Sequence, residues 1–213
     1  MEQKIIDYLV RECEPEVILL GGSRSKGRET KESDWDLILI GNKKGKSGFI
    51  EFEDQLLDIT FKDWPEENKP LPTPYGPLWP AKVLLDQSKG KLQKVLNKNE
   101  EDFNKGSLAL YREAIVKRLK QLESWKRKMD KYAENSMVEF FYAGIFYEIA
   151  IRLWLEGRNK WSLPPSEALP IIQNEDKEFY DLLSLFTSTS PIQRISITKD
   201  ILERLEKTLK SNK

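Results

Sequence analysis

Residues 19–40 read LLGGSRSKGRETKESDWDLILI, and the interpretation of the whole chain starts from this stretch. An apolar run ends in Gly21-Gly22-Ser23, ten residues follow, and Asp34-Trp35-Asp36 opens a second apolar run. Because side chains alternate faces along a β-strand, we expect Asp34 and Asp36 on one face, about 7 Å apart, and Trp35 on the other. Two such carboxylates repel each other unless a cation lies between them. Hard oxygen ligands of this kind suit Mg²⁺, and Mn²⁺ is an alternative.

A third acid is expected to join this pair. Residues 55–61 read QLLDITF, a strand-like run in which Asp58 is the single charged residue. The alternation of the strand places Asp58 on one face with Leu56 and Thr60, and the apolar residues between them on the other. Because burial of an unpaired carboxylate is costly, a metal ion shared with the first two acids would supply the partner that Asp58 needs.

The order and spacing of these residues resemble the signature of the DNA polymerase beta-type nucleotidyltransferase superfamily. The resemblance is to its small prokaryotic members with a C-terminal helical domain, such as antibiotic nucleotidyltransferases and minimal nucleotidyltransferase antitoxins. It implies that Asp34, Asp36 and Asp58 hold two Mg²⁺ ions, and that Asp58 acts as the third ligand or as the base that activates the acceptor. It also implies that Gly22 and Ser23 hold the β- and γ-phosphates of a nucleotide.

The residue types suit this chemistry by themselves. Glycine allows backbone N–H groups to approach a polyphosphate closely, and two metal ions can clamp the attacking and leaving oxygens of an in-line displacement. Arg24 and Lys26 follow the Gly-Ser turn directly and are the candidates for contact with the triphosphate. The alternative for both is a position in a solvated, charged loop.

Composition excludes several other classes of protein. The 213 residues include one cysteine and no histidine, which excludes Ser-His-Asp and Cys-His triads, histidine-ligated zinc and an internal disulfide. Division of the chain at residue 95 leaves net charges of −2 and +2 on the two parts. Neither part has the basic excess typical of proteins that bind long nucleic acid, so we expect a compact acceptor. No run is long enough to span a membrane and the N-terminus does not resemble a signal peptide, so a cytoplasmic location is expected.

The pattern predicts an α+β fold. We expect a small mixed sheet flanked by helices in a catalytic domain over residues 1–96, and a bundle of four or five helices over residues 97–213. The predicted elements, listed in chain order, are a helix at 3–12, strands at 17–20, 34–40, 49–53, 56–61 and 82–86, and helices at 108–132, 137–155, 166–172, 176–186 and 191–210.

Residues 64–80 hold six of the eleven prolines and are expected to be extended loop. This segment is interpreted as a connector around the sheet. The alternative is an aromatic wall beside the acceptor, formed by Trp64, Tyr75 or Trp79.

Residues 137–155 are apolar nearly all round, which indicates either a central helix of the bundle or a dimer interface. A homodimer through the helical domain is therefore one expected assembly. Glu148 and Arg152 are four residues apart and are expected to pair on one face. The alternative is that Glu139 or Glu148 faces the site and orients the acceptor.

These observations predict a Mg²⁺-dependent nucleotidyltransferase. It would transfer a nucleoside monophosphate from ATP or another NTP to a hydroxyl or amine of a small-molecule or protein acceptor and release pyrophosphate. The alternative is a catalytically silent module that binds a nucleotide or a partner. The identity of the acceptor stays open, since a hydroxylated antibiotic, a protein side chain and an RNA end all fit.

Overall fold

The computed structural model describes residues 1–41, 44–66, 69–73, 76–78 and 81–211. The chain divides into two compact units, Met1–Asn104 and Lys105–Lys213. The predicted domain boundary between residues 96 and 97 lies within α3 (Lys91–Lys105), and the division into a catalytic and a helical domain stays a prediction.

Unit 1 is built on a mixed five-stranded sheet with the strand order β3-β4-β2-β1-β7. The strands are β1 (Val17–Leu20), β2 (Trp35–Ile40), β3 (Gly48–Phe52), β4 (Gln55–Lys62) and β7 (Lys82–Asp86). β2 and β4 run parallel, while the other neighbouring pairs are antiparallel. The predicted α+β class and the mixed sheet are confirmed.

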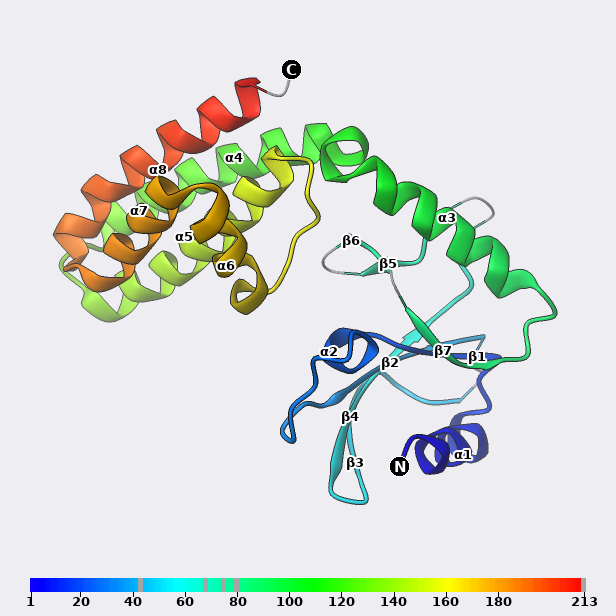
Figure 1. Ribbon diagram of the computed structural model, residues 1–213. Helices are drawn as coiled ribbons and strands as arrows, with labels where there is room; N and C mark the ends of the chain where they lie inside the picture. Colours follow the sequence, from blue (N-terminus) through cyan, green and yellow to red (C-terminus); the bar gives the residue numbers. More distant parts are fainter. Residues whose placement is uncertain (42–43, 67–68, 74–75, 79–80, 212–213) are drawn as a thin grey trace. The chain divides into compact units, whose positions relative to one another are not determined.

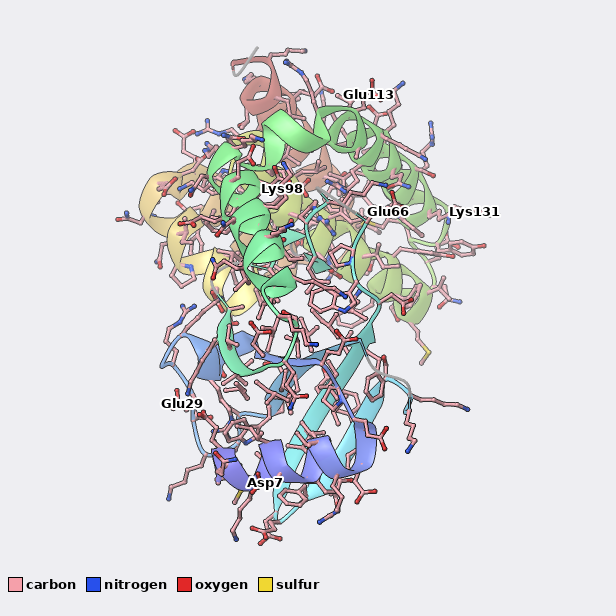
Figure 2. All side chains as sticks on the ribbon, turned by 90° about the vertical axis from the view of Figure 1, so that its right-hand side faces the viewer. Asp7, Glu29, Glu66, Lys98, Glu113 and Lys131 are labelled. Atoms are coloured by element: carbon pink, nitrogen blue, oxygen red, sulfur yellow. The ribbon has the colours of Figure 1, made fainter. Side chains whose placement is uncertain are left out.

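One face of the sheet packs against α1 (Glu2–Cys13), which lies on one side of the sheet in Figure 1. Ile5 and Leu9 of α1 are fully buried against Leu37 of β2 and Leu57 of β4. These apolar side chains recur at helical spacing on α1 and at every second position on the strands, so burial of one face of each element follows from the sequence pattern. Charged side chains such as Asp7 lie on the outer face of α1 (Figure 2).

Within the described residues of unit 1, a second apolar cluster covers part of the opposite face of the sheet. Val17, Leu19 and Ile40 pack there against Leu92 of α3 and against Leu71, from the proline-rich segment. That segment contains a short hairpin of β5 (Pro72–Thr73) and β6 (Gly76–Pro77). The start of β2, the middle of β4 and all of β3 lie outside this cluster, and the candidate site lies on that part of the face.

Unit 2 is a helical bundle. Its helices are α4 (Ser107–Lys131), α5 (Ser136–Gly157), α6 (Pro165–Glu175), α7 (Lys177–Ser188) and α8 (Pro191–Ser211). The second half of α5 is buried as expected for a central helix of the bundle, because Ala150, Leu153 and Trp154 are fully buried. Over its first half, Met137, Phe140 and Phe141 are exposed. The homodimer through this unit stays a prediction.

Two buried carboxylates join the helices of unit 2. Asp176 accepts hydrogen bonds from Trp154 Nε1 at 3.0 Å and from Arg158 and Arg204, each at 2.7 Å. Glu156 accepts from Arg118 and Arg152. Because a buried charge is tolerated only when it is paired and hydrogen-bonded, these networks fix how the helices pack.

Gly157 is the last residue of α5, and a Cβ there would meet Thr208 at 3.1 Å, so the glycine permits close packing. Arg152 pairs with Glu156 and not with the predicted Glu148. In the part of the chain that the structure describes, no helix is long and apolar enough to cross a membrane.

Candidate functional site

The three predicted acids lie on the face of the sheet opposite α1. Trp35 is buried in the cluster on the α1 side, and alternation directs Asp34 and Asp36 to the other side. Asp36 of β2 and Asp58 of β4 are register partners in the parallel pair of strands. Residues that are partners on adjacent strands project on the same face, so Asp58 joins the first two acids across the strand boundary.

The carboxylates converge closely enough to share a cation. Each acid offers one oxygen, and these oxygens all lie within 4.8 Å of one another. Burial raises the pKa of Asp36, and the charges of Asp34 and Asp58 raise it further, while Lys26 lowers it. Burial and Asp34 likewise raise the pKa of Asp58. An all-oxygen, partly buried and mutually repulsive set of this kind fits a hard divalent cation.

The Gly-Ser turn packs directly on this acidic cluster. Gly21 N donates to the carbonyl oxygen of Asp36 at 2.8 Å, and the one-turn helix α2 (Gly22–Ser25) begins at the next residue. Gly22 has φ 61°, and a Cβ built on it would overlap the Asp36 carboxylate. Only glycine therefore combines this backbone conformation with this approach to the acid. The turn therefore lies against the acids, and the phosphate-binding roles of Gly22 and Ser23 stay predictions.

The fold and the acidic cluster agree with a comparison to known families. Residues 3–65 match the family described as polymerase beta, nucleotidyltransferase. These residues form a polymerase beta-type nucleotidyltransferase domain. Comparison of the chain with curated proteins finds no match.

Within the nucleotidyltransferase domain, Arg24 contacts the backbone that carries Asp34. Its Nη2 donates to Ser33 O at 2.6 Å and its Nε donates to Asp34 O at 2.9 Å. The guanidinium lies over the Trp35 ring, 4.6 Å from the centroid, and Gln55 Oε1 accepts from both Arg24 and Trp35. Gln55 is the first residue of β4, so Arg24 links the Gly-Ser turn to the starts of both acid-bearing strands. Its predicted contact with a triphosphate stays a prediction.

Lys26 is the second predicted cation of the nucleotidyltransferase domain. Its side chain is exposed, and its charge lowers the pKa of Asp36. The ammonium is therefore near enough to the acids to attract an anionic ligand held there. Contact of Lys26 with a triphosphate stays a prediction.

The predicted acceptor-side acids belong to unit 2. Glu139 is fully buried, and its Oε2 accepts from Arg194 Nη1 at 2.6 Å. Its Oε1 has no hydrogen-bond partner among the described residues. Glu148 is exposed on α5. The acceptor roles of both residues stay predictions.

Of the three residues named for the alternative aromatic wall, the structure describes only Trp64. Trp64 Nε1 donates to Glu16 Oε2, and the Trp64 ring packs in the cluster beneath α3. The other two aromatic candidates, Tyr75 and Trp79, lie outside the described residues. Phe49 of β3, which sequence reasoning did not select, is the register partner of Asp58 and is 67% exposed. Residues 49–53 read FIEFE, and this alternation is a signal for Phe49. Ile50 and Phe52 pack on the α1 side of the sheet, so Phe49 lies on the side of the acids.

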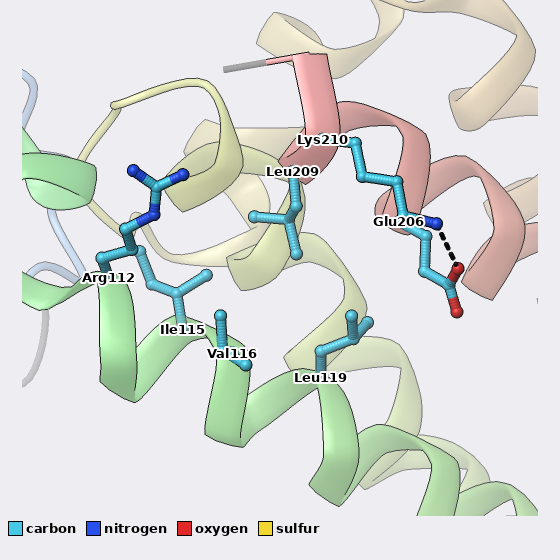
Figure 3. A pocket seen from close by; sticks show the side chains of 7 residues that line it. All are labelled: Arg112, Ile115, Val116, Leu119, Glu206, Leu209 and Lys210. Carbon is cyan, nitrogen blue, oxygen red and sulfur yellow. Dashed lines mark hydrogen bonds and ion pairs between the residues drawn. The ribbon is translucent and has the colours of Figure 1, made fainter. Parts of the chain in front are cut away.

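A pocket of about 230 Å³ lies between α4 and α8 of unit 2 (Figure 3). Ile115, Val116, Leu119 and Leu209 supply its apolar lining. Glu206 and Lys210 pair with each other on α8 at 3.3 Å. Because its one carboxylate is paired, this pocket offers no set of metal ligands comparable with the acidic cluster of the nucleotidyltransferase domain.

Proposed function

We propose that the protein is a divalent-metal-dependent nucleotidyltransferase that transfers a nucleoside monophosphate from an NTP to a hydroxyl or amine. One observation carries the proposal: three carboxylate oxygens lie within 4.8 Å of one another, beside a glycine turn that packs on Asp36. The family match over residues 3–65 supports the same reaction class.

Asp34, Asp36 and Asp58 would hold the metal ions, Mg²⁺ in the first instance. When bound, such ions neutralise the phosphates and stabilise the charge that develops on the attacking and leaving oxygens. The Gly22–Ser23 backbone would hold the β- and γ-phosphates, and Lys26 would add a positive charge beside them.

In the transfer step, an oxygen or nitrogen of the acceptor forms a bond to the α-phosphorus. The bond from that phosphorus to the bridging oxygen breaks, and pyrophosphate leaves. Asp58 would act as the third metal ligand or would accept the proton of the acceptor, and burial and the charge of Asp34 raise its pKa in the protein without metal. Asp58 is also the acid closest to the edge strand β3, on the side away from the Gly-Ser turn.

The decisive experiment is calorimetric titration of ATP, GTP, CTP and UTP, with and without Mg²⁺, into the wild type and the Asp34→Asn/Asp36→Asn protein. We expect tight binding of at least one nucleotide that needs both the metal and the two acids. The preferred nucleotide is then used to measure pyrophosphate release with candidate acceptors. Nucleotide binding that is unchanged in the double variant, or transfer by an Asp34→Asn protein, would rule out the proposal. Metal-dependent binding with no release of pyrophosphate with any acceptor would favour the silent module.

A cytoplasmic location stays a prediction.

A further inference from the structure

An apolar surface lies beside the acidic cluster on the edge of the sheet. Phe49 is directly opposite Asp58 in the antiparallel β3–β4 pair, and Leu56 is two residues before Asp58 on β4. Both project from the same face as Asp58 because strand side chains alternate. Phe49 is 67% exposed and Leu56 is 44% exposed. Two adjoining exposed apolar side chains beside a cluster of carboxylates offer a surface that a ligand of the site can cover.

The order of groups across the sheet assigns the two sides of the site. The Gly-Ser turn contacts Asp36 on β2, Asp58 follows on β4, and Phe49 follows on the edge strand β3. If the turn holds the phosphates of the nucleotide, the acceptor must approach from the other side of the acids. Directly opposed residues of an antiparallel pair have Cβ atoms about 5 Å apart, so a ring that contacts Phe49 can place its own hydroxyl at Asp58.

We propose that Phe49 and Leu56 form the acceptor subsite, and that the acceptor carries its reactive hydroxyl on an aromatic or other flat apolar body. This inference rests on the proposed function. Glu51 lies on the same face, opposite Leu56, and offers a hydrogen-bond acceptor at the outer end of the subsite. Contact between an aromatic acceptor and Phe49 buries apolar area and orients the hydroxyl toward Asp58. The hydroxyl oxygen then bonds to the α-phosphorus, the bond from that phosphorus to the bridging oxygen breaks, and pyrophosphate and the hydroxyl proton leave.

The test uses three hydroxyl-bearing probes of different chemistry: 4-methylphenol, glycerol and the cationic sugar glucosamine. Binding to the full-length protein with Mg²⁺ and the preferred NTP is measured by ligand-observed NMR, and pyrophosphate release is measured in parallel. Phe49→Ala removes the ring, and Phe49→Trp keeps an aromatic surface. Val83→Ala is the matched control, because Val83 is an exposed apolar residue on β7, the opposite edge strand of the same sheet.

We expect 4-methylphenol to bind more tightly than the other two probes and to stimulate pyrophosphate release more strongly. Phe49→Ala should weaken its binding about fivefold or more, while Phe49→Trp and Val83→Ala leave it close to wild type. The KM for the NTP should not change in Phe49→Ala. Absence of 4-methylphenol binding, a preference for glycerol or glucosamine, or an equal effect of Phe49→Ala and Val83→Ala would overturn the inference.

Failure of this inference is distinguishable from failure of the proposed function. Metal-dependent NTP binding that needs Asp34 and Asp36 is measured on the same preparations and does not involve Phe49. If that binding is present and the aromatic preference is absent, the acceptor subsite is wrong and the nucleotidyltransferase assignment stands. If that binding is absent, the proposed function itself is wrong.

Discussion

Asp36 and Asp58 are register partners on the parallel strands β2 and β4, so two carboxylates lie side by side on one face of the sheet. Asp34 adds a third, and all three come within 4.8 Å. Like charges on directly neighbouring strand positions destabilise a sheet, and burial adds to the cost. The metal-free protein therefore carries repulsion at this site that a bound divalent cation relieves.

Replacement of Asp36 by asparagine should stabilise the metal-free protein at neutral pH. The folded-state pKa of Asp36 lies above its unfolded value, so the charged carboxylate disfavours the folded state above that pKa, and this cost disappears as the pH falls below the unfolded pKa. We expect Asp36→Asn to raise the thermal midpoint in EDTA by about 1–4 °C at pH 7, with a smaller gain near pH 4. Scanning calorimetry or circular dichroism measures the shift.

The control for this change is Asp63→Asn, at an exposed acid beyond the end of β4. It should leave the midpoint within about 1 °C of wild type. Added Mn²⁺ should raise the midpoint of the wild type and of Asp63→Asn but not that of Asp36→Asn. A lower midpoint for Asp36→Asn in EDTA would contradict the repulsion argument.

Gly22→Ala should damage the site more than Gly27→Ala. Both glycines have positive φ, 61° and 64°, so alanine meets similar backbone strain at each. A Cβ on Gly22 overlaps the Asp36 carboxylate, whereas a Cβ on Gly27 has no described atom within 4 Å. We expect Gly22→Ala to weaken Mn²⁺ binding at least about tenfold by calorimetry and to lower stability by about 2–3 kcal/mol.

The Gly27→Ala protein measures the backbone strain alone. We expect a loss of about 1 kcal/mol in stability and no change in Mn²⁺ affinity. Equal effects of the two substitutions on metal binding would mean that contact with Asp36 is not what requires glycine in the turn.

Arg24 should act as a positioning residue for Asp34. Its hydrogen bonds to Ser33 O and Asp34 O hold the backbone at the start of β2, and lysine cannot reproduce a contact that uses both Nε and Nη2. We expect Arg24→Lys to weaken Mn²⁺ binding about five- to tenfold in the absence of nucleotide. A residue that touched only the triphosphate would leave metal affinity in the absence of nucleotide unchanged, which calorimetry with Mn²⁺ alone distinguishes. Lys31→Ala, at an exposed lysine of the same loop, is the control.

Asp176→Asn should destabilise unit 2 without effect on the metal site. Burial raises the pKa of Asp176, but hydrogen bonds from Arg204 and Trp154 outweigh burial and hold it below its usual value. The stability that these contacts contribute is present above the unfolded pKa and is lost as the pH falls through the folded pKa. We expect a loss of about 3 kcal/mol at pH 7 in denaturant unfolding, because two arginines lose a buried partner.

Asp181→Asn is the matched control, since Asp181 forms an exposed ion pair with Lys177 one helical turn away. Its effect should be about 0.5 kcal/mol or less. Similar losses for the two variants would show that burial does not set the strength of the Asp176 network.

Much of this architecture was predictable because local patterns agree with the final packing. The alternation around Trp35 predicts which face each acid occupies, and the helical spacing in residues 3–12 predicts the face that α1 buries. The hydrogen-bond partners of Arg24 are an example of what such local patterns do not predict. The charge of Arg24 and its place after Ser23 suggest a phosphate ligand. Yet its guanidinium donates to the backbone carbonyls of Ser33 and Asp34, nine and ten residues away, and composition does not encode these contacts.

The sequence by itself predicted that Asp34, Asp36 and Asp58 form one set of metal ligands, because metal-ligand chemistry depends on residue type, spacing and strand periodicity, all of which are local. Tertiary structure decided which residues adjoin the acids, because strand order and register are set by packing over long sequence separations. The parallel register of β2 and β4 brings Asp58 beside Asp36, and the placement of β3 at the edge leaves Phe49 exposed next to them.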